Sequence, residues 1–154
     1  AGDPREELVG QKGLFARKLI PRLTTFPVSC PVYKEQDFYR TRTALFEMER
    51  SERYAYEFRS KPQGEKKQMG DESVVADLWS GNEVKYVNDH RNSSRPANVE
   101  FCELVVRGWP HLLLVALRDI EPDEELLTDY GSGYWENRLL KDELLWDVKC
   151  RVLE

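Results

Sequence analysis

The sequence predicts a single β-rich α+β domain, and three observations support that fold class. A chain of 154 residues suits one domain that is large enough to bury a hydrophobic core. Its segments of strand character are short and are separated by long irregular connections. Only residues 137–152 show a clear amphipathic helical period, in which apolar residues recur at Leu140, Leu144, Leu145 and Val148. Many short strands beside one helix are typical of the α+β class.

The N-terminal part begins with a polar lead-in, residues 1–7, followed by extended segments. Residues 14–16 are a short apolar strand after a Gly turn, and Ile20-Pro21 marks a break. Residues 24–35 are rich in β-forming residues, but two prolines restrict them to an edge strand or an irregular extended segment. Residues 38–53 are mixed and charged, which favours a short helix.

The middle of the chain predicts two strands around a loop. Tyr54, Tyr56 and Phe58 recur with period two, as in a strand. Residues 59–72 contain two Gly, one Pro and many charges, so we expect a mobile hairpin tip or loop there. Val74–Trp79 is the next short strand.

Further along, residues 99–106 and 111–118 predict a hairpin whose connection is Gly108-Trp109-Pro110, which is not a standard two-residue turn. Residues 119–129 hold six acidic residues and no basic one. A carboxylate pair for hydrolysis could be drawn from this segment, but a solvated face is the favoured interpretation.

Composition narrows the possible functions. The net charge of −5 and pI of about 5.2 argue against nucleic-acid binding through a basic face and favour a basic protein or peptide partner. Ordinary solubility charge is the alternative. Three widely spaced cysteines, Cys30, Cys102 and Cys150, exclude a four-cysteine zinc site, and we expect no metal. The longest apolar run, Leu112–Leu117, is too short to span a membrane.

Common catalytic patterns are absent from the sequence, which has no nucleophile elbow and no phosphate-binding loop. Of the two histidines, His111 lies in a predicted apolar strand, and a structural role is expected for it. Two segments are unusual for a plain scaffold. The first, residues 81–101, crowds four asparagines among apolar residues, and the second places Tyr130 before a Gly-x-Gly bend.

These segments resemble the SET domain of protein lysine methyltransferases. The family's KGxGxFA pattern and following Ile correspond to Lys12-Gly13-Leu14-Phe15-Ala16 and Ile20-Pro21. Its central motif, which ends in NHxCxPN, corresponds to Asp77, Gly81-Asn82, Tyr86-Val87-Asn88, Pro96 and Asn98. Its last motif, IxxGEELxxDYG, corresponds to Ile120, Glu124-Glu125-Leu126 and Asp129-Tyr130-Gly131. The ending Tyr134-Trp135 resembles small viral-type SET proteins, and Tyr86-Val87-Asn88 resembles the PR subclass.

The resemblance implies a fold of several small β-sheets over residues 8–136, with a C-terminal pseudoknot between the Asn88 segment and the Tyr130 segment. A helical extension, residues 137–154, would pack on this domain. It also implies an S-adenosylmethionine site and a narrow lysine channel. Tyr130 would be the catalytic tyrosine. The cofactor-binding residues would be Lys12, Gly13, Leu14, Asn88, Asp89 and Trp135. We place Tyr56, Phe58, Thr128 and Tyr134 along the substrate channel.

The function that the resemblance implies is methyl transfer from S-adenosylmethionine to a lysine side chain of a basic protein, with a histone tail as the first candidate. A nuclear location would follow from a histone substrate, and the chain could be a monomer or a homodimer. The family's NHSC reads Asn88-Asp89-His90-Arg91 here, and its YxG is missing. These departures keep open an alternative, a SET or PR-type module that binds a protein partner without turnover. A chance match on an unrelated β-rich scaffold is the third hypothesis.

Overall fold

The computed structural model describes residues 12–40, 54–58, 74–91 and 93–134, and the structural statements below concern that part of the chain. The strands are β1 (Thr25–Pro27), β2 (Val32–Lys34), β3 (Ala55–Glu57), β4 (Val74–Asp77), β5 (Asn88–Asp89), β6 (Val99–Val106), β7 (Trp109–Ala116) and β8 (Leu127–Thr128). The helices are α1 (Glu35–Arg40) and the 3-10 helix η2 (Glu83–Tyr86). Short strands in three small sheets confirm the predicted β-rich α+β fold. The predicted lead-in, the loop at 59–72 and the helix at 137–152 lie outside the described residues.

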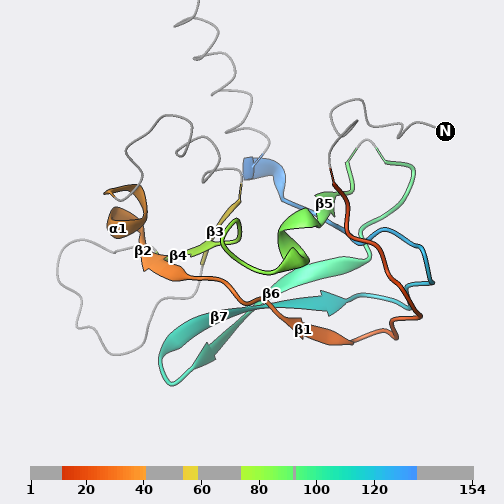
Figure 1. Ribbon diagram of the computed structural model, residues 1–154, viewed down its shortest axis with the longest axis horizontal. Helices are drawn as coiled ribbons and strands as arrows, with labels where there is room; N and C mark the ends of the chain where they lie inside the picture. The colour runs from red at the N-terminus through yellow and green to blue at the C-terminus, as the bar shows by residue number, and fades with distance from the viewer. Residues whose placement is uncertain (1–11, 41–53, 59–73, 92, 135–154) are drawn as a thin grey trace, which may run out of the picture.

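The largest sheet has the order β1-β7-β6 and forms the lower side of the molecule in Figure 1. Its hairpin is confirmed, but the predicted connection is wrong. The turn is Arg107-Gly108, with φ of 53° and 80°, and β7 already begins at Trp109. Two positive φ values are what a type I′ turn requires, and the twist of that turn matches the twist of the strands. The following Pro110 is therefore a strand residue, paired with Val105.

The second sheet has the order β2-β4-β3 and carries α1 at one end, at the left of Figure 1. All four residues of β4 are buried, as expected for a central strand covered on both faces. The helix α1 begins at Glu35, three residues before the predicted start. Acidic Glu35 and Asp37 occupy its first turn, where they favour the positive end of the helix. Phe38 on α1 is fully buried, and its ring lies 6.1 Å from that of Tyr33.

The third sheet joins β5 and β8 in parallel, through the pairs Asn88↔Leu127 and Asp89↔Thr128. These are the two segments that the resemblance predicts to thread each other. The segment 14–16 does not form the predicted strand; it makes an isolated bridge, Phe15↔Glu125, to the chain just before β8. The same three regions of the chain therefore converge on one side of the molecule.

Two clusters of buried apolar side chains form the core. The larger lies between the β1-β7-β6 sheet and the β5-β8 side: Ala16, Val84, Val87, Val99, Leu114, Ala116, Ile120 and Leu126. The smaller joins the first two sheets: Phe58, Val74, Ala76 and Leu112. Val28 and Phe101 pack against both clusters, so the core is continuous. No described helix is long and apolar enough to cross a membrane.

Candidate active site

Three segments that are far apart in sequence meet around β5 and β8. The backbone N–H of Leu126 donates to the carbonyl of Leu14 at 2.8 Å, and the N–H of Ala16 donates to Glu124 at 2.9 Å. On the other side of β8, the N–H of His90 donates to the carbonyl of Thr128 at 2.8 Å. Backbone hydrogen bonds therefore join the segment that carries Lys12, Gly13 and Leu14, through the chain around β8, to the segment that carries Asn88 and Asp89.

Tyr130 is held at both its backbone and its side chain. Its hydroxyl donates to the carbonyl of Val87 at 2.6 Å, and its N–H donates to Oδ2 of Asp89 at 2.7 Å. The ring meets that of Tyr134 edge-on, with centroids 4.8 Å apart. Gly131, directly after it, has φ of 82°, which a residue with a side chain rarely adopts. The Tyr-Gly junction therefore fixes the phenol between β5 and the turn after β8.

The environment of Tyr130 keeps its hydroxyl protonated. Burial raises the pKa of this phenol well above its ordinary value, and the charges of Tyr134, Asp89 and Tyr54 raise it further. A neutral phenol offers one O–H donor and two lone pairs. Because the proton is given to Val87, the lone pairs are what Tyr130 can offer to a reacting group.

Asn88 points its amide nitrogen into the protein. Nδ2 donates to Oε1 of Glu125 at 2.9 Å and to the carbonyl of Lys12 at 3.3 Å. Among the described residues, none donates a hydrogen bond to the amide oxygen Oδ1. The side chain therefore keeps one acceptor for a ligand.

Asp89 uses its carboxylate to shape the turn around Tyr130. The side chain is buried, and its two oxygens accept from the N–H groups of Arg91 and Tyr130, each at 2.7 Å. In a parallel ladder the residues that bond to the partner strand alternate with residues that face away. Because the N–H of His90 bonds to β8, the backbone polar groups of Asp89 face away from β8. That orientation leaves the backbone of Asp89 available for the cofactor contact that the family resemblance implies for this residue.

Asn98 ties the start of β6 to β8. It is 1% exposed, its N–H donates to the carbonyl of Leu127, and its Oδ1 accepts from the N–H of the same residue, each at 2.8 Å. Its Nδ2 donates to the carbonyl of Glu125 at 2.8 Å. The asparagines of the central segment are thus partly structural and partly available to a ligand.

The acidic segment, residues 119–129, which includes β8, is only partly the solvated face that the sequence predicts. Asp119, Glu121, Asp123 and Asp129 are exposed, but Glu125 is 7% exposed and Glu124 is half-buried. Glu124 accepts two hydrogen bonds from the guanidinium of Arg118. This pairing, with further hydrogen bonds, lowers the pKa of the Glu124 carboxyl to about 2. Sequence reasoning missed both glutamates as organising residues, although the adjacent pair in the last motif was a usable signal.

The residues predicted to line the channel fall into two groups. Tyr134 lies against Tyr130, and Thr128, two residues before Tyr130 in the sequence, is buried in β8. Tyr56 and Phe58 pack instead around Phe101 and the smaller core cluster, and the Tyr56 hydroxyl donates to Glu103 at 3.2 Å. Their place in the channel stays a prediction, whereas Tyr54, which was not predicted, interacts electrostatically with Tyr130. Trp135 lies outside the described residues.

Cationic side chains lie over aromatic rings beside η2. The Lys12 ammonium is 5.4 Å from the centroid of the Tyr86 ring, and the Lys85 ammonium lies 5.4 Å from the same ring and 5.1 Å from that of Trp79. Such contacts stabilise a charged amine by about 0.5–1 kcal/mol at exposed sites. They place two positive charges near the segment that carries Asn88.

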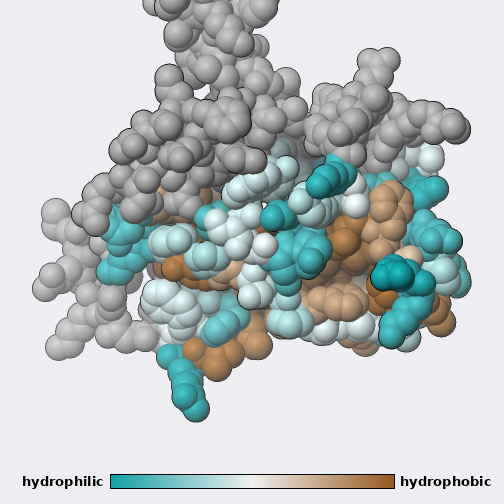
Figure 2. All heavy atoms as spheres, in the orientation of Figure 1, coloured by the Kyte–Doolittle hydropathy of each residue, from teal (hydrophilic) through white to brown (hydrophobic). Residues whose placement is uncertain are grey.

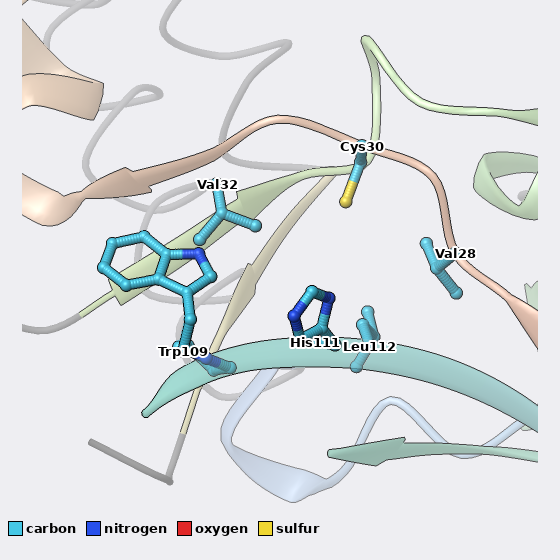
Figure 3. Close-up of a pocket in the computed structure, with 7 residues that line it drawn as sticks. Val28, Cys30, Val32, Trp109, His111 and Leu112 are labelled. Carbon is cyan, nitrogen blue, oxygen red and sulfur yellow. The ribbon is translucent and has the colours of Figure 1, made fainter. Parts of the chain in front are cut away.

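A cavity of about 220 Å³ lies elsewhere, at the start of β7. It is lined by Val28, Cys30, Val32, Trp109, Pro110, His111 and Leu112, and Figure 3 shows Cys30 and His111 turned towards it. None of the predicted site residues lines this cavity. His111 is exposed, because it lies on the outer face of β7, where alternate residues face away from the core; its structural role stays a prediction. Burial and the charge of Asp77 raise the pKa of the Cys30 thiol to about 11.

The amino-acid sequence was compared with models of known protein families. Residues 11–131 match the family model of the SET domain, which covers most of the sequence. The chain belongs to the SET-domain family. A comparison with curated protein sequences gives no match. SET domains are in general protein lysine methyltransferases that use S-adenosylmethionine, so the family supplies an activity class. The described residues contain no group of three or more potential metal-binding side chains.

The residues around Asn88 fit the amino-acid part of S-adenosylmethionine. An α-ammonium needs acceptors, and Asn88 keeps Oδ1 as one. An α-carboxylate needs a cation, and Lys12 supplies an exposed ammonium on the neighbouring segment. Beyond Tyr130, a side chain built at Gly131 or Gly133 would meet no atom within 4 Å, so the backbone there leaves space. In this SET domain an amide acceptor on Asn88 and a cation on Lys12 therefore lie on segments that match the family motifs, and their contact with the cofactor stays a prediction.

Proposed function

We propose that this SET domain transfers a methyl group from S-adenosylmethionine to the side-chain amine of a lysine in a basic protein. The observation that carries the proposal is the junction of β5 and β8. There the Tyr130 hydroxyl donates to the carbonyl of Val87, and the side chain of the following residue, Asn88, donates to the carbonyl of Lys12. The proposed catalytic phenol and the proposed cofactor-binding amide thus come from two distant segments, and the phenol is anchored on Val87, the residue directly before Asn88.

The residues divide the chemistry between them. When bound, S-adenosylmethionine supplies an electrophilic methyl group on a positively charged sulfur. Asn88 and Lys12 bind and orient its amino-acid part. Tyr130 directs its oxygen lone pairs at the reacting centre, where they orient the lysine amine. Alignment of two reactants in this way can lower a barrier by ~7–11 kcal/mol.

The lysine must react as the neutral amine, although its ordinary pKa is about 10.4. A buried aromatic environment disfavours the ammonium form and lowers that pKa. The edge-on rings of Tyr130 and Tyr134 supply aromatic surface of this kind. Because Tyr130 stays protonated well above neutral pH, it acts by hydrogen bonding and not as a general base.

A histone tail is the first candidate substrate, and a nuclear location would accompany it. Support comes from the net charge of −5, which favours a basic partner, and from the four exposed acidic residues of the segment 119–129. A methyl-transfer assay on full-length histones and on basic non-histone proteins would identify the substrate class. Transfer to neither class would contradict the assignment of a basic protein.

The decisive test uses labelled S-adenosylmethionine and two matched variants. We expect Tyr130→Phe to lower the rate of transfer at least 100-fold while retaining affinity for S-adenosylhomocysteine in calorimetric titration. Tyr33→Phe, the same chemical change on β2, is the control and should keep the wild-type rate. Wild-type turnover by Tyr130→Phe would overturn the assigned role. A wild-type chain that binds no S-adenosylhomocysteine would point to the alternative, a partner-binding module.

A further inference from the structure

Glu125 is a buried carboxylate that contacts the predicted cofactor site from behind. It lies 37 positions away from Asn88 in sequence, yet its Oε1 is 2.9 Å from Nδ2 of Asn88. The residue is 7% exposed, so water screens this contact little. A hydrogen bond with one ionised partner is shorter and stronger than one between neutral groups.

This contact decides which way the Asn88 amide faces. An amide has a donor end and an acceptor end of nearly the same shape, whereas an ionised carboxylate and a backbone carbonyl can only accept. Both partners of Nδ2, Glu125 and the Lys12 carbonyl, are acceptors. A flipped amide would set its oxygen against both of them. The nitrogen is therefore held inward, and Oδ1 is held outward.

We infer that Glu125 is a positioning residue for cofactor binding: it holds the Asn88 amide in the one orientation that presents Oδ1 to the ammonium of the cofactor's amino-acid part. The inference rests on the proposed function. The two adjacent glutamates then have different roles. Glu124 forms an ion pair with Arg118, whereas Glu125 accepts a hydrogen bond from the side-chain amide of Asn88.

Gly13 lies directly against the Glu125 carboxylate that contacts Asn88. A Cβ built at Gly13 would lie 2.7 Å from Oε1 of Glu125 and 3.0 Å from Cε2 of Phe15. The exposed Phe15 ring can yield, but the Glu125 carboxylate is fixed by its burial and its hydrogen bond. Absence of a side chain at Gly13 therefore makes room for the carboxylate in the position that Asn88 requires.

The first experiment separates orientation from charge. Calorimetric titration with S-adenosylhomocysteine would compare wild type, Glu125→Ala and Glu125→Gln, with exposed Glu121→Ala as the control from the same segment. We expect Glu125→Ala to bind about tenfold more weakly, since the amide loses a charge-assisted hydrogen bond. Glu125→Gln, whose amide oxygen can still accept from Nδ2, should stay within about threefold of wild type. Unchanged affinity in Glu125→Ala, or equal loss in Glu125→Gln and Glu125→Ala, would overturn the inference.

The second experiment uses Gly13→Ala to test the shared mechanism. Alone, this substitution should displace the carboxylate and weaken binding about as much as Glu125→Ala does. In the double variant the clash with Oε1 is gone, so the two losses should not multiply. Losses that multiply would show that Gly13 acts independently of Glu125.

A readout without cofactor keeps this inference separate from the proposed function. The Asn88 side-chain NH₂ resonances of the ligand-free protein, assigned by their loss in Asn88→Ala, should move in Glu125→Ala and stay near their wild-type positions in Glu125→Gln. If the resonances do not move in Glu125→Ala, Glu125 does not orient the amide. If they behave as expected but wild type binds no S-adenosylhomocysteine, the proposed function fails and the role in cofactor binding fails with it.

Discussion

The two strand pairings that matter most in this molecule are built in opposite ways. The β6–β7 hairpin has eight consecutive residue pairs and a two-residue turn, so the backbone ladder alone defines it. The β5–β8 pairing has two residue pairs and joins segments almost forty positions apart. Side chains complete it: Asp89, Asn98 and Glu125 donate or accept across the junction.

Their surfaces differ in the same way. The hairpin exposes apolar side chains, with Leu104 at 47%, Val106 at 43% and Trp109 at 42%, and Figure 2 shows hydrophobic residues reaching the surface along the lower side of the molecule. The β5–β8 side buries polar ones. A backbone ladder tolerates many side chains, whereas a buried hydrogen-bond network requires particular ones. We therefore expect substitutions to cost most where the strands are shortest.

The largest expected effect is at Asn98. Replacement by Ala leaves the N–H of Leu127 and the carbonyl of Glu125 without their side-chain partner in a buried environment. The expected loss is about 2–4 kcal/mol of unfolding free energy, measured by urea denaturation. Leu104→Ala on the hairpin is the control, with an expected loss below about 1 kcal/mol. Equal losses at the two positions would contradict the contrast between the pairings.

Asp89 should come next. In Asp89→Asn one carboxylate oxygen becomes an NH₂ group, so only one of the N–H groups of Arg91 and Tyr130 keeps its acceptor. We expect a loss of about 1–2 kcal/mol in urea denaturation. If Asp89 also fixes Tyr130 for catalysis, methyl transfer should fall more than binding of S-adenosylhomocysteine. A stable variant with full activity would show that the backbone alone holds the Tyr130 turn.

The hairpin and the junction also differ in how much the sequence reveals. The alternation of apolar and polar residues in β6 and β7 and the glycine of their turn lie close together in the sequence, so the hairpin was predictable. The glycine at position 108 did not show that Arg107 would also adopt a positive φ. Contacts such as Glu125 with Asn88 depend on how distant segments pack, and no local pattern encodes them. Family motifs supplied Asn88, Asp89 and Tyr130. Neither source indicated Tyr54 or the exposure of His111.

Low pH should reduce the stabilisation that Glu124 provides next to the β5–β8 junction. The folded-state pKa of Glu124 is about 2, below its ordinary 4.5, because Arg118 and neighbouring donors favour the carboxylate. The stabilisation is complete above about pH 4.5 and is lost as the pH falls towards about 2. We expect roughly 1 kcal/mol from this pair, since Arg118 is partly exposed. Urea denaturation between pH 7 and pH 2.5 should show a smaller acid-dependent loss in Arg118→Ala than in wild type.

The smallest expected effect has the opposite sign and lies in the hairpin turn. Arg107 adopts φ of 53°, a conformation that costs most residues with a side chain some energy but that Asn and Gly adopt readily. Arg107 is exposed, so its replacement disturbs no packing. Arg107→Asn should therefore raise the unfolding free energy by about 0.5 kcal/mol and leave cofactor binding unchanged. The type I′ turn sets the register of all eight residue pairs of the hairpin. If Arg107→Asn instead lowered the unfolding free energy, the side chains of β6 and β7, and not the turn and backbone ladder, would determine the stability of the hairpin. The contrast with the β5–β8 pairing would then fail.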